Sequence, residues 1–427
     1  MKRAYWPVER LREYQNKELR RIVRYAYDNV PFYHNRFREE GVKPSEIDTV
    51  ADLNKLPILR KDETRKNFDL FVSREYDVAR LKMLRTSGST GKPFHFYITG
   101  KEDEFRKAKH LRANISCGQK PRDKWVTITS ALHLGETTRL QRLSDIFVPT
   151  HVSVFDDVAT QISKISELKP DVLDGYSSSL LILSREIEKR GAETIRPKFV
   201  VGGAEFVGNS SQQSIEKVFD APFYDQYACE EMERIAWQCP EKDQYHIDAD
   251  SIIVQFVDEN GEEVAPGERG EIICTSLFNY AVPFIRYSVG DVGAPSNEEC
   301  SCGRTLPLMK VVEGRKDSFL LLPGGQVLSP MAFDGAMCMF KFHGNIDQFR
   351  IKQRKTDLFE FCIKMLANGR IDEKTVEQEL LNYLWRTLNL NPDEVAFDVK
   401  FVEDLPLDTN GKLRKVISEL GQTPNYM

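Results

Sequence analysis

A run of hydroxyls, glycines and one lysine near the end of the first hundred residues is the strongest chemical signal in the chain. It consists of Thr86, Ser87, Gly88, Ser89, Thr90, Gly91, Lys92 and Pro93. Glycines let a backbone approach an anion and turn its N–H groups inward, while hydroxyls and the lysine add donors and positive charge. Only two residues separate the glycines and a proline follows the lysine, unlike a Walker P-loop. The run therefore indicates a phosphate-binding loop of another kind, with a flexible Ser/Gly loop as the alternative.

Four potential metal ligands form a second group, namely Cys239, His246, Cys300 and Cys302. The last two form a Cys-x-Cys knuckle, and the antiparallel β-structure expected between the two pairs would bring them together. Four nitrogen and sulfur ligands fit a closed tetrahedral zinc site. The sequence favours one structural zinc ion, and reduced thiols beside a surface histidine are the alternative.

Carboxylates lie in two further segments of the chain. Tyr227-Ala228-Cys229-Glu230-Glu231 offers acids for Mg²⁺, which needs only one or two protein carboxylates when it bridges phosphates. An acidic pair at the start of a helix is the alternative for this segment. Asp291 ends the segment that begins at Ile285, and a carboxylate there can accept hydrogen bonds from two hydroxyls at once.

In their order along the chain, these motifs resemble those of the adenylate-forming superfamily of acyl-CoA synthetases, luciferases and peptide-synthetase adenylation domains. The likeness is strongest to the branch that holds phenylacetate–CoA ligase and the CapK-type capsule proteins, and it runs from about Val30 to Lys412. CapK-type relatives also place Cys and His at the four metal-ligand positions, which adds to the zinc interpretation.

The resemblance implies a role for each nucleotide-binding motif. The run from Thr86 to Lys92 would hold the ATP phosphates, and Gly203 and Ala204 would border the adenine through their backbone. Tyr227 would stack on the adenine, Glu231 would bind Mg²⁺, and Asp291 would bind the ribose hydroxyls. Ala228 stands where the family has glycine.

The same resemblance assigns three residues to a mobile C-terminal part. Arg315 would meet the ribose or phosphate, Asp317 would be the pivot of a hinge, and Lys412 would neutralise charge between the substrate carboxylate and the α-phosphate. A lysine on an exposed turn is the alternative for Lys412. His133 and Tyr176 are candidates for the acyl pocket.

Periodicity predicts the elements that must position these residues. Apolar residues at helical spacing predict a helix from Val8 to about Asn29. Strand-like and helix-like segments then alternate from residue 125 to 203, which favours an α/β architecture. Antiparallel strands follow from residue 252, with a hairpin turn at Asn260-Gly261.

Past residue 313 the pattern predicts a β-β-α-β unit whose helix spans Ile371 to Leu388. We therefore expect an α/β fold with a large N-terminal ATP- and substrate-binding domain, residues 1–313, and a small mobile α+β lid domain, residues 314–427, hinged at Asp317.

Bulk composition excludes several classes of protein. The net charge of −5 gives no basic footprint for nucleic acid, and no stretch approaches the length of a membrane span. Eight cysteines in 427 residues do not indicate a disulfide scaffold, and the start lacks a signal peptide. We expect a cytoplasmic enzyme, and leave a homodimer open.

The expected reaction is ATP-dependent ligation of a carboxylic acid. The enzyme would form an acyl- or aryl-adenylate with Mg²⁺ and ATP, then transfer the acyl group to coenzyme A and release AMP and pyrophosphate. Two alternatives remain open, an adenylating enzyme with an amine, hydroxyl or carrier-protein acceptor, and a non-catalytic nucleotide-binding homologue.

Overall fold

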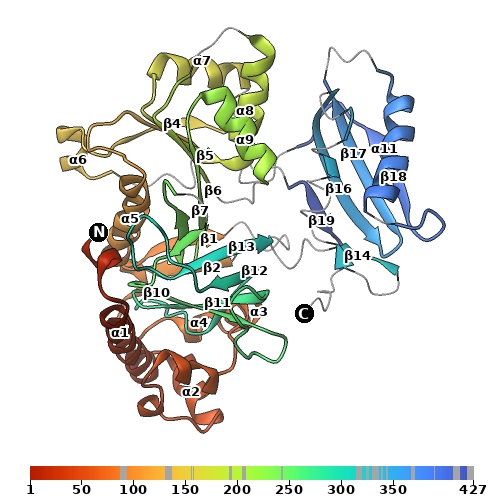
Figure 1. The fold of residues 1–427 in the computed structure, drawn as a ribbon. Helices are drawn as coiled ribbons and strands as arrows, with labels where there is room; N and C mark the ends of the chain where they lie inside the picture. Colours follow the sequence, from red (N-terminus) through yellow and green to blue (C-terminus); the bar gives the residue numbers. More distant parts are fainter. Residues whose placement is uncertain are drawn as a thin grey trace.

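The computed structural model contains one large mixed sheet with its helices and a second, smaller sheet near the C-terminus (Figure 1). It describes residues 1–86, 94–129, 137–154, 156, 158–191, 195–203, 208–241, 244–313, 320–323, 327–328, 336–337, 340–342, 345–366, 371–388, 390–406 and 414–420.

The N-terminal region is helical. Helix α1 (Val8–Asn29) confirms the predicted range and buries an apolar stripe, whereas α2 (Pro31–Glu39) begins at the very next proline. The residue before a proline disfavours helical backbone, and proline itself is well suited to the first helical position. A short helical segment, η1 (Lys2–Tyr5), precedes α1. Others follow α2, namely η2 (Pro44–Glu46), η3 (Val50–Lys55), α3 (Lys61–Lys66), α4 (Phe68–Phe71) and η4 (Val78–Arg80).

The large sheet has eleven strands in the order β10-β11-β12-β13-β9-β8-β7-β6-β5-β3-β4. Its parallel part comprises β3 (Trp125–Thr129), β4 (Pro149–Ser153), β5 (Val172–Tyr176), β6 (Phe199–Gly203) and β7 (Phe223–Cys229). Its antiparallel part comprises β8 (Glu233–Gln238), β9 (Tyr245–Ile247), β10 (Ile252–Val257), β11 (Gly270–Ser276), β12 (Tyr287–Ser296) and β13 (Leu308–Glu313). The predicted change from α/β alternation to antiparallel strands is confirmed, but it occurs earlier than residue 252, between β7 and β8.

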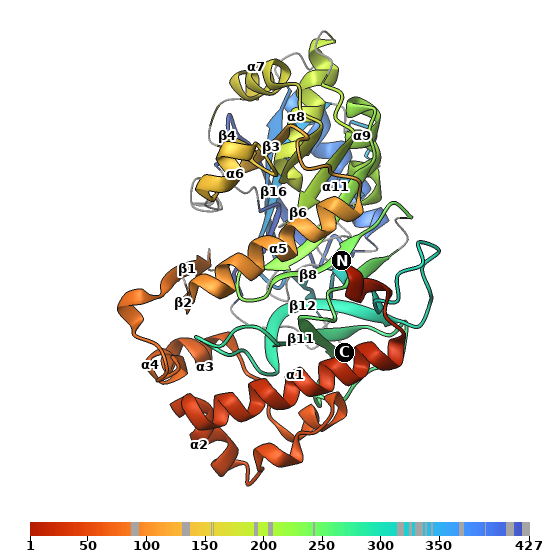
Figure 2. The same ribbon diagram turned by 90° about the vertical axis from the view of Figure 1, so that its left-hand side faces the viewer.

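Helices cover both faces of the parallel part. On one face, α7 (Val158–Leu168), α8 (Ser177–Arg190) and α9 (Asn209–Phe219) share an apolar core with β3, β5, β6 and β7. Helix α5 (Gly100–Ser116) packs on β8 and crosses the middle of the large body (Figure 2). The short helix α6 (Arg139–Ser144) precedes β4.

A separate hairpin carries the ends of the predicted phosphate loop. Strand β1 (Lys82–Thr86) pairs antiparallel with β2 (Phe94–Ile98), and Thr86 lies opposite Phe94. The seven residues between them are outside the described ranges. The hairpin therefore places both ends of the loop side by side.

Gly202 and Gly203 are the last two residues of β6, in agreement with the sequence pattern, in which a glycine pair closes this strand. A Cβ atom at Gly202 would come within 2.1 Å of the Phe223 ring. The glycine is therefore required for the close packing of β6 on β7, rather than for a turn.

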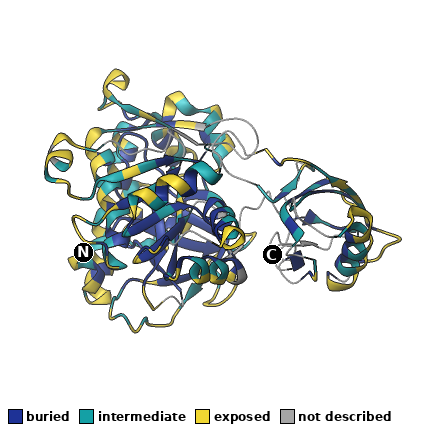
Figure 3. Ribbon diagram, turned by 90° about the horizontal axis from the view of Figure 1, so that it is seen from above, coloured by how far each residue is buried: buried dark blue, intermediate teal, exposed yellow. Residues whose placement is uncertain are grey.

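The C-terminal body holds the predicted β-β-α-β unit, namely β16 (Ile346–Lys355), β17 (Leu358–Met365), α11 (Glu373–Thr387) and β18 (Ala396–Phe401). A short strand that the sequence did not reveal, β19 (Val416–Ser418), completes the sheet order β18-β17-β16-β19. A small hairpin of β14 (Leu320–Leu321) and β15 (Val327–Leu328) precedes it. The apolar core of this body is a cluster of its own, and Figure 3 shows its buried interior beside that of the large body.

The first sixty residues pack on strands that are far away in the sequence. The Tyr33 hydroxyl donates to the Pro283 carbonyl (2.9 Å) and accepts from the Ile285 amide (3.0 Å). The Leu59 amide donates to the Arg286 carbonyl at 2.8 Å. None of the described helices is long and apolar enough to cross a lipid bilayer.

Candidate active site

The turn between β7 and β8 lies where the large sheet changes from parallel to antiparallel. Strand β7 ends at Cys229, and β8 returns from Glu233 with Cys229 paired to Glu233. Glu230 and Glu231 therefore lie in a tight turn between strands, and the alternative of an acidic pair at a helix start is wrong. In open α/β sheets, ligands bind beyond the carboxyl ends of the parallel strands. This turn is in such a position.

The Glu231 carboxylate is buried and has two partners. Its Oε1 accepts a hydrogen bond from the Tyr287 hydroxyl (2.7 Å) and lies 3.0 Å from Lys61 Nζ. Burial raises the pKa of Glu231, but the Lys61 charge and the Tyr287 hydrogen bond outweigh it and hold this pKa below its ordinary value. Glu231 is therefore ionised at neutral pH, and a carboxylate has further lone pairs for a cation.

Tyr227 and Asp291 form a second hydrogen-bonded pair at this site. The Tyr227 hydroxyl donates to Asp291 Oδ2 at 2.6 Å, joining β7 to β12. Burial and the Asp291 charge raise the pKa of Tyr227 well above its ordinary value, so this hydroxyl remains a donor. The two predicted motifs are thus joined by two hydrogen bonds. Tyr227 of the first motif donates to Asp291 of the second, and Tyr287 of the second donates to Glu231 of the first.

Gly203 is the last residue of β6, beside the same strand end. A Cβ atom there would lie 3.1 Å from the Gln226 carbonyl oxygen, which is closer than an ordinary contact. Its neighbour in the predicted adenine-bordering turn, Ala204, lies outside the described residues, as do Ser87–Lys92, Arg315, Asp317, Lys412 and His133. The described part of the chain thus brings Tyr227, Glu231, Asp291 and Gly203 to one region, and leaves the other assignments as predictions.

Sequence reasoning missed two residues of this site. Lys61 lies in the segment Leu56-Pro57-Ile58-Leu59-Arg60-Lys61-Asp62, which resembles the phenylacetate–CoA ligase branch but which a loop also explains, and its partner Glu231 is 170 positions away. Tyr287 lies inside a recognised motif, but no role was assigned to it. In both cases the segment was the available signal, and it did not reveal the contact partner. Tyr176, a candidate for the acyl pocket, is buried and its hydroxyl accepts from Thr129 Oγ1 at 3.1 Å.

The predicted metal ligands form one cluster on the antiparallel part of the sheet. Cys239 follows β8, His246 lies in β9, and Cys300 and Cys302 lie between β12 and β13. Cys239 Sγ is 3.6 Å from Cys300 Sγ, Cys302 Sγ is 3.4 Å from His246 Nε2, and all four ligand atoms lie within 4.8 Å of one another. Ligands about 2.0–2.3 Å from a tetrahedral zinc ion are separated by roughly 3.5–3.8 Å.

The surroundings of the cluster fit a metal as well. Burial lowers the pKa of His246 to about 4, so its imidazole is neutral and can act as a ligand. The segment between β12 and β13, which carries Cys300 and Cys302, also contacts the start of the chain. In it, the backbone N–H of Thr305 donates to the Ala4 carbonyl at 2.9 Å. The cluster therefore lies where three strands and the N-terminal segment meet.

Comparisons with known proteins give full-length relatives. Phenylacetate-coenzyme A ligase of Escherichia coli K12 is 30% identical over 389 residues, which cover 87% of this chain and 83% of the relative. The protein of the same name from Thermus thermophilus is 29% identical, covering 96% and 97%. Protein CapK of Staphylococcus aureus is 23% identical, covering 98% and 93%. No protein-family model matches the sequence.

Among solved structures, 2-hydroxyisobutyryl-CoA ligase in the postadenylation state, in complex with R3-HIB-AMP, is similar to this chain. The TM-score is 0.80 at 20% identity, and the match covers 98% of this chain and 92% of the other. At this identity the likeness establishes a common fold, with a large N-terminal body and a small C-terminal one.

Proposed function

Because the chain belongs to the phenylacetate–coenzyme A ligase branch of the adenylate-forming superfamily, we propose that it is an ATP-dependent acid–thiol ligase. It joins a carboxylic acid to AMP, releases pyrophosphate, and transfers the acyl group to coenzyme A with release of AMP. The observation that carries this proposal is the convergence of Tyr227, Glu231 and Asp291 at the end of β7, in a chain related over its full length to such ligases.

In the first half-reaction, an oxygen of the substrate carboxylate attacks the α-phosphorus of ATP. An O–P bond forms, and the bond to the pyrophosphate leaving group breaks. Asp291 binds the ribose hydroxyls, the Tyr227 ring stacks on the adenine, and residues 87–92 hold the β- and γ-phosphates. Catalysis consists mainly of positioning and charge neutralisation.

Glu231 is the proposed Mg²⁺ ligand, and a carboxylate that is buried, ionised and fixed by Tyr287 fits that role. When bound, Mg²⁺ neutralises phosphate charge. Lys61 contributes a positive charge beside the same carboxylate, at 3.0 Å in this structure.

We also propose that residues 314–427 act as a lid that turns about Asp317 between the two half-reactions. The separate apolar core of the C-terminal body supports this division, because such a body can move without opening its own interior. Lys412 belongs to the adenylation arrangement, and Arg315 to the ribose or phosphate contacts.

Cys239, His246, Cys300 and Cys302 are proposed to hold one structural zinc ion. The spacing of their ligand atoms and the neutral imidazole support a closed site with four protein ligands. We place the enzyme in the cytoplasm, where ATP and coenzyme A are available.

The decisive experiment is a screen of aliphatic and aromatic carboxylic acids for ATP-dependent pyrophosphate release. An acid that supports release is then incubated with coenzyme A, and the thioester is sought by mass spectrometry. Thioester formation is the expected result. Acyl-AMP that accumulates and is not consumed by coenzyme A would favour an amine, hydroxyl or carrier-protein acceptor, and no pyrophosphate release with any acid would favour a non-catalytic homologue.

A further inference from the structure

Helix α5 buries positive charge on the face that packs on β8. Arg106, Lys109 and Arg112 are each at most 8% exposed and follow one another at intervals of three residues. Burying a charge is costly unless it is paired or hydrogen-bonded. Each of these side chains therefore needs a compensating partner, and those partners reveal what the helix holds in place.

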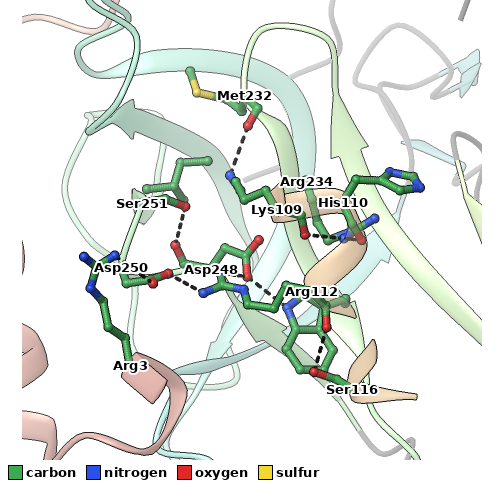
Figure 4. A network of polar contacts seen from close by, with 12 residues as sticks. Arg3, Lys109, His110, Arg112, Ser116, Met232, Arg234, Asp248, Asp250 and Ser251 are labelled. Carbon is green, nitrogen blue, oxygen red and sulfur yellow. Dashed lines mark hydrogen bonds and ion pairs between the residues drawn. The ribbon is translucent and has the colours of Figure 1, made fainter. Parts of the chain in front are cut away.

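The partners of two of them lie in the Glu231 turn. Arg106 Nη1 donates to the Glu230 carbonyl at 2.8 Å, and Lys109 Nζ donates to the Met232 carbonyl at 3.1 Å (Figure 4 shows the second contact). The Glu231 carbonyl between them accepts from Asn279 Nδ2 at 2.9 Å. Three successive carbonyls thus each receive a hydrogen bond from a different buried side chain. We call Arg106, Lys109 and Asn279 the carbonyl clamp.

Each member of the carbonyl clamp is itself fixed. Arg106 also pairs with the Glu233 carboxylate at 3.2 Å, and the Lys109 ammonium lies 5.0 Å from the centre of the Phe278 ring. The backbone N–H of Asn279 donates to Ser276 Oγ at 3.2 Å. The donors therefore come from rigid parts of the fold rather than from mobile side chains.

The next turn of α5 fixes the helix to the antiparallel part of the sheet. Arg112 pairs with Asp248 and, at 2.7 Å, with Asp250 (Figure 4). Asp248 also accepts from Trp237 Nε1 of β8 at 2.9 Å. Lys109 consequently reaches the Glu231 turn from a helix whose position is set by buried ion pairs.

The contacts divide into two sets. Lys61 and Tyr287 contact the Glu231 carboxylate, whereas Arg106, Lys109 and Asn279 donate to backbone oxygens of the turn. Arg106 also lies 3.5 Å from the Glu230 carboxylate. Mg²⁺ demands near-ideal octahedral geometry, with ligand distances of about 2.0–2.1 Å. A ligand carboxylate in a turn can meet that demand only if the backbone that carries it is held still.

We propose that Arg106, Lys109 and Asn279 are positioning residues that hold the Glu231 turn in the geometry required for Mg²⁺·ATP. This inference rests on the proposed function, because it takes Glu231 as the metal ligand. The role assigned to the clamp residues is to hold the backbone of the turn, to which all three donate. Their effect is on the affinity for the metal, since partners of metal ligands typically change that affinity by about 10–100-fold.

The test compares Lys109→Met with Lys107→Met in the full chain. Methionine keeps the length and the packing against Phe278 but cannot donate to the Met232 carbonyl. Lys107 lies on the same helix and pairs with Asp103 and Glu104 instead, so its variant is a matched control. Asn279→Ala removes a neutral clamp member and serves as a second probe if loss of the buried lysine prevents folding.

Two measurements do not depend on turnover. Mn²⁺ binding is followed by electron paramagnetic resonance with a non-hydrolysable ATP analogue, and the dissociation constant should rise about tenfold in Lys109→Met and Asn279→Ala. Amide hydrogen exchange of residues 229–233 should be faster in these variants and unchanged in Lys107→Met. Equal Mn²⁺ affinity in all four proteins, with folded variants, would overturn the inference.

A third measurement is the Mg²⁺ dependence of pyrophosphate release. The half-saturating Mg²⁺ concentration should rise about tenfold in Lys109→Met, while the rate at saturating Mg²⁺ stays within about threefold of the wild type. If Lys109→Met lowers the maximal rate but leaves the half-saturating Mg²⁺ concentration unchanged, the clamp does not position the Glu231 turn for the metal. A wild-type protein that releases no pyrophosphate with any acid would overturn the proposed function, and the Mn²⁺ titration would still decide the role of the clamp.

Discussion

Two tyrosine hydroxyls connect the acids of the candidate active site at the scale of single residues. Tyr227 donates to Asp291, and Tyr287 donates to Glu231, so each predicted nucleotide-binding motif supplies a hydrogen bond to the acid of the other. Such a hydrogen bond restricts the rotamer of the acid that accepts it. Loss of either motif should therefore disturb both.

The contacts of the acidic pair favour Glu231 over Glu230 as the candidate ligand. Glu231→Gln should lower acid-dependent pyrophosphate release by about two orders of magnitude, the scale of one electrostatic stabiliser. Glu230→Gln should lose less than about tenfold, because its carboxylate lies 3.5 Å from Arg106 and takes no part in the Tyr287 contact. Steady-state rates at saturating ATP check both, and the reverse order of losses would mean that Glu230 is the ligand.

Acid sensitivity should arise partly from Glu233. Burial raises the pKa of this carboxyl, but the charge of Arg106 and the hydrogen bond and charge of His110 outweigh it and bring the pKa to about 2. An unfolded glutamate has a pKa of about 4.3. The stabilisation is therefore complete above the unfolded value, is lost as pH falls toward 2, and amounts to about 2–3 kcal/mol.

Urea unfolding between pH 6 and pH 3 tests this contribution of Glu233 to stability. The pKa of His110 is raised, so its imidazole stays protonated throughout that pH range. The free energy of unfolding of the wild type should exceed that of Glu233→Gln at pH 6, and the difference should shrink once the pH falls below about 4.3, the pKa of an unfolded glutamate. A difference that does not change with pH would remove Glu233 from the acid response.

Strand order accounts for the metal cluster at the scale of elements. Because β9 lies between β8 and β13, residues near the ends of these strands meet, and His246 pairs in register with Leu308. The sequence predicted the ligand types and the antiparallel strands, since periodicity of two and a Cys-x-Cys knuckle are local signals. It could not predict Lys61 beside Glu231, because nothing within a few residues of either one encodes a contact between α3 and the β7–β8 turn.

The same limit applies to packing details and to short strands. The sequence pattern indicates a strand that ends in a glycine pair, yet only the neighbouring Phe223 ring reveals why position 202 requires glycine. Strand β19 has only three residues, which are too few to show a strand periodicity in the sequence. It pairs in parallel with β16, which lies much earlier in the chain.

Protein purified without added metal should contain about one zinc ion per chain by elemental analysis. Cys302→Ser should lose most of this zinc and melt at a lower temperature, because a structural metal contributes directly to folding. Cys362→Ser, in the C-terminal sheet, is the matched control and should keep its zinc. Less than about a tenth of an equivalent in the wild type, with a melting temperature insensitive to chelator, would exclude a structural zinc.

At the scale of the whole molecule, the two bodies each have their own core, and the proposed catalytic lysine belongs to the smaller one. Lys412 lies outside the described residues, so its role remains a prediction from the motif. A lysine carried by a lid that turns can serve only the half-reaction in which the lid brings it to the site. Its loss should therefore separate the two halves of the reaction.

Lys412→Ala should lower acyl-AMP formation by at least about two orders of magnitude, since one electrostatic stabiliser of the α-phosphate is removed. Thioester formation from presynthesised acyl-AMP and coenzyme A should persist. Pyrophosphate exchange and thioester assays measure the two halves separately, with Lys415→Ala as a control in the same part of the chain. Near-normal pyrophosphate release in Lys412→Ala would refute the assignment.

The packing of the N-terminal helices on distant strands also governs how the protein is made. Tyr33 and its partner Pro283 are 250 residues apart. A ribosome that adds roughly 5–20 residues per second needs about 12–50 s to synthesise that interval. During this time the apolar faces of α1 and α2 have left the exit tunnel while β11 and β12 do not yet exist. The apolar faces of these helices therefore stay uncovered until their partners are made, and transiently exposed apolar surface of this kind favours aggregation.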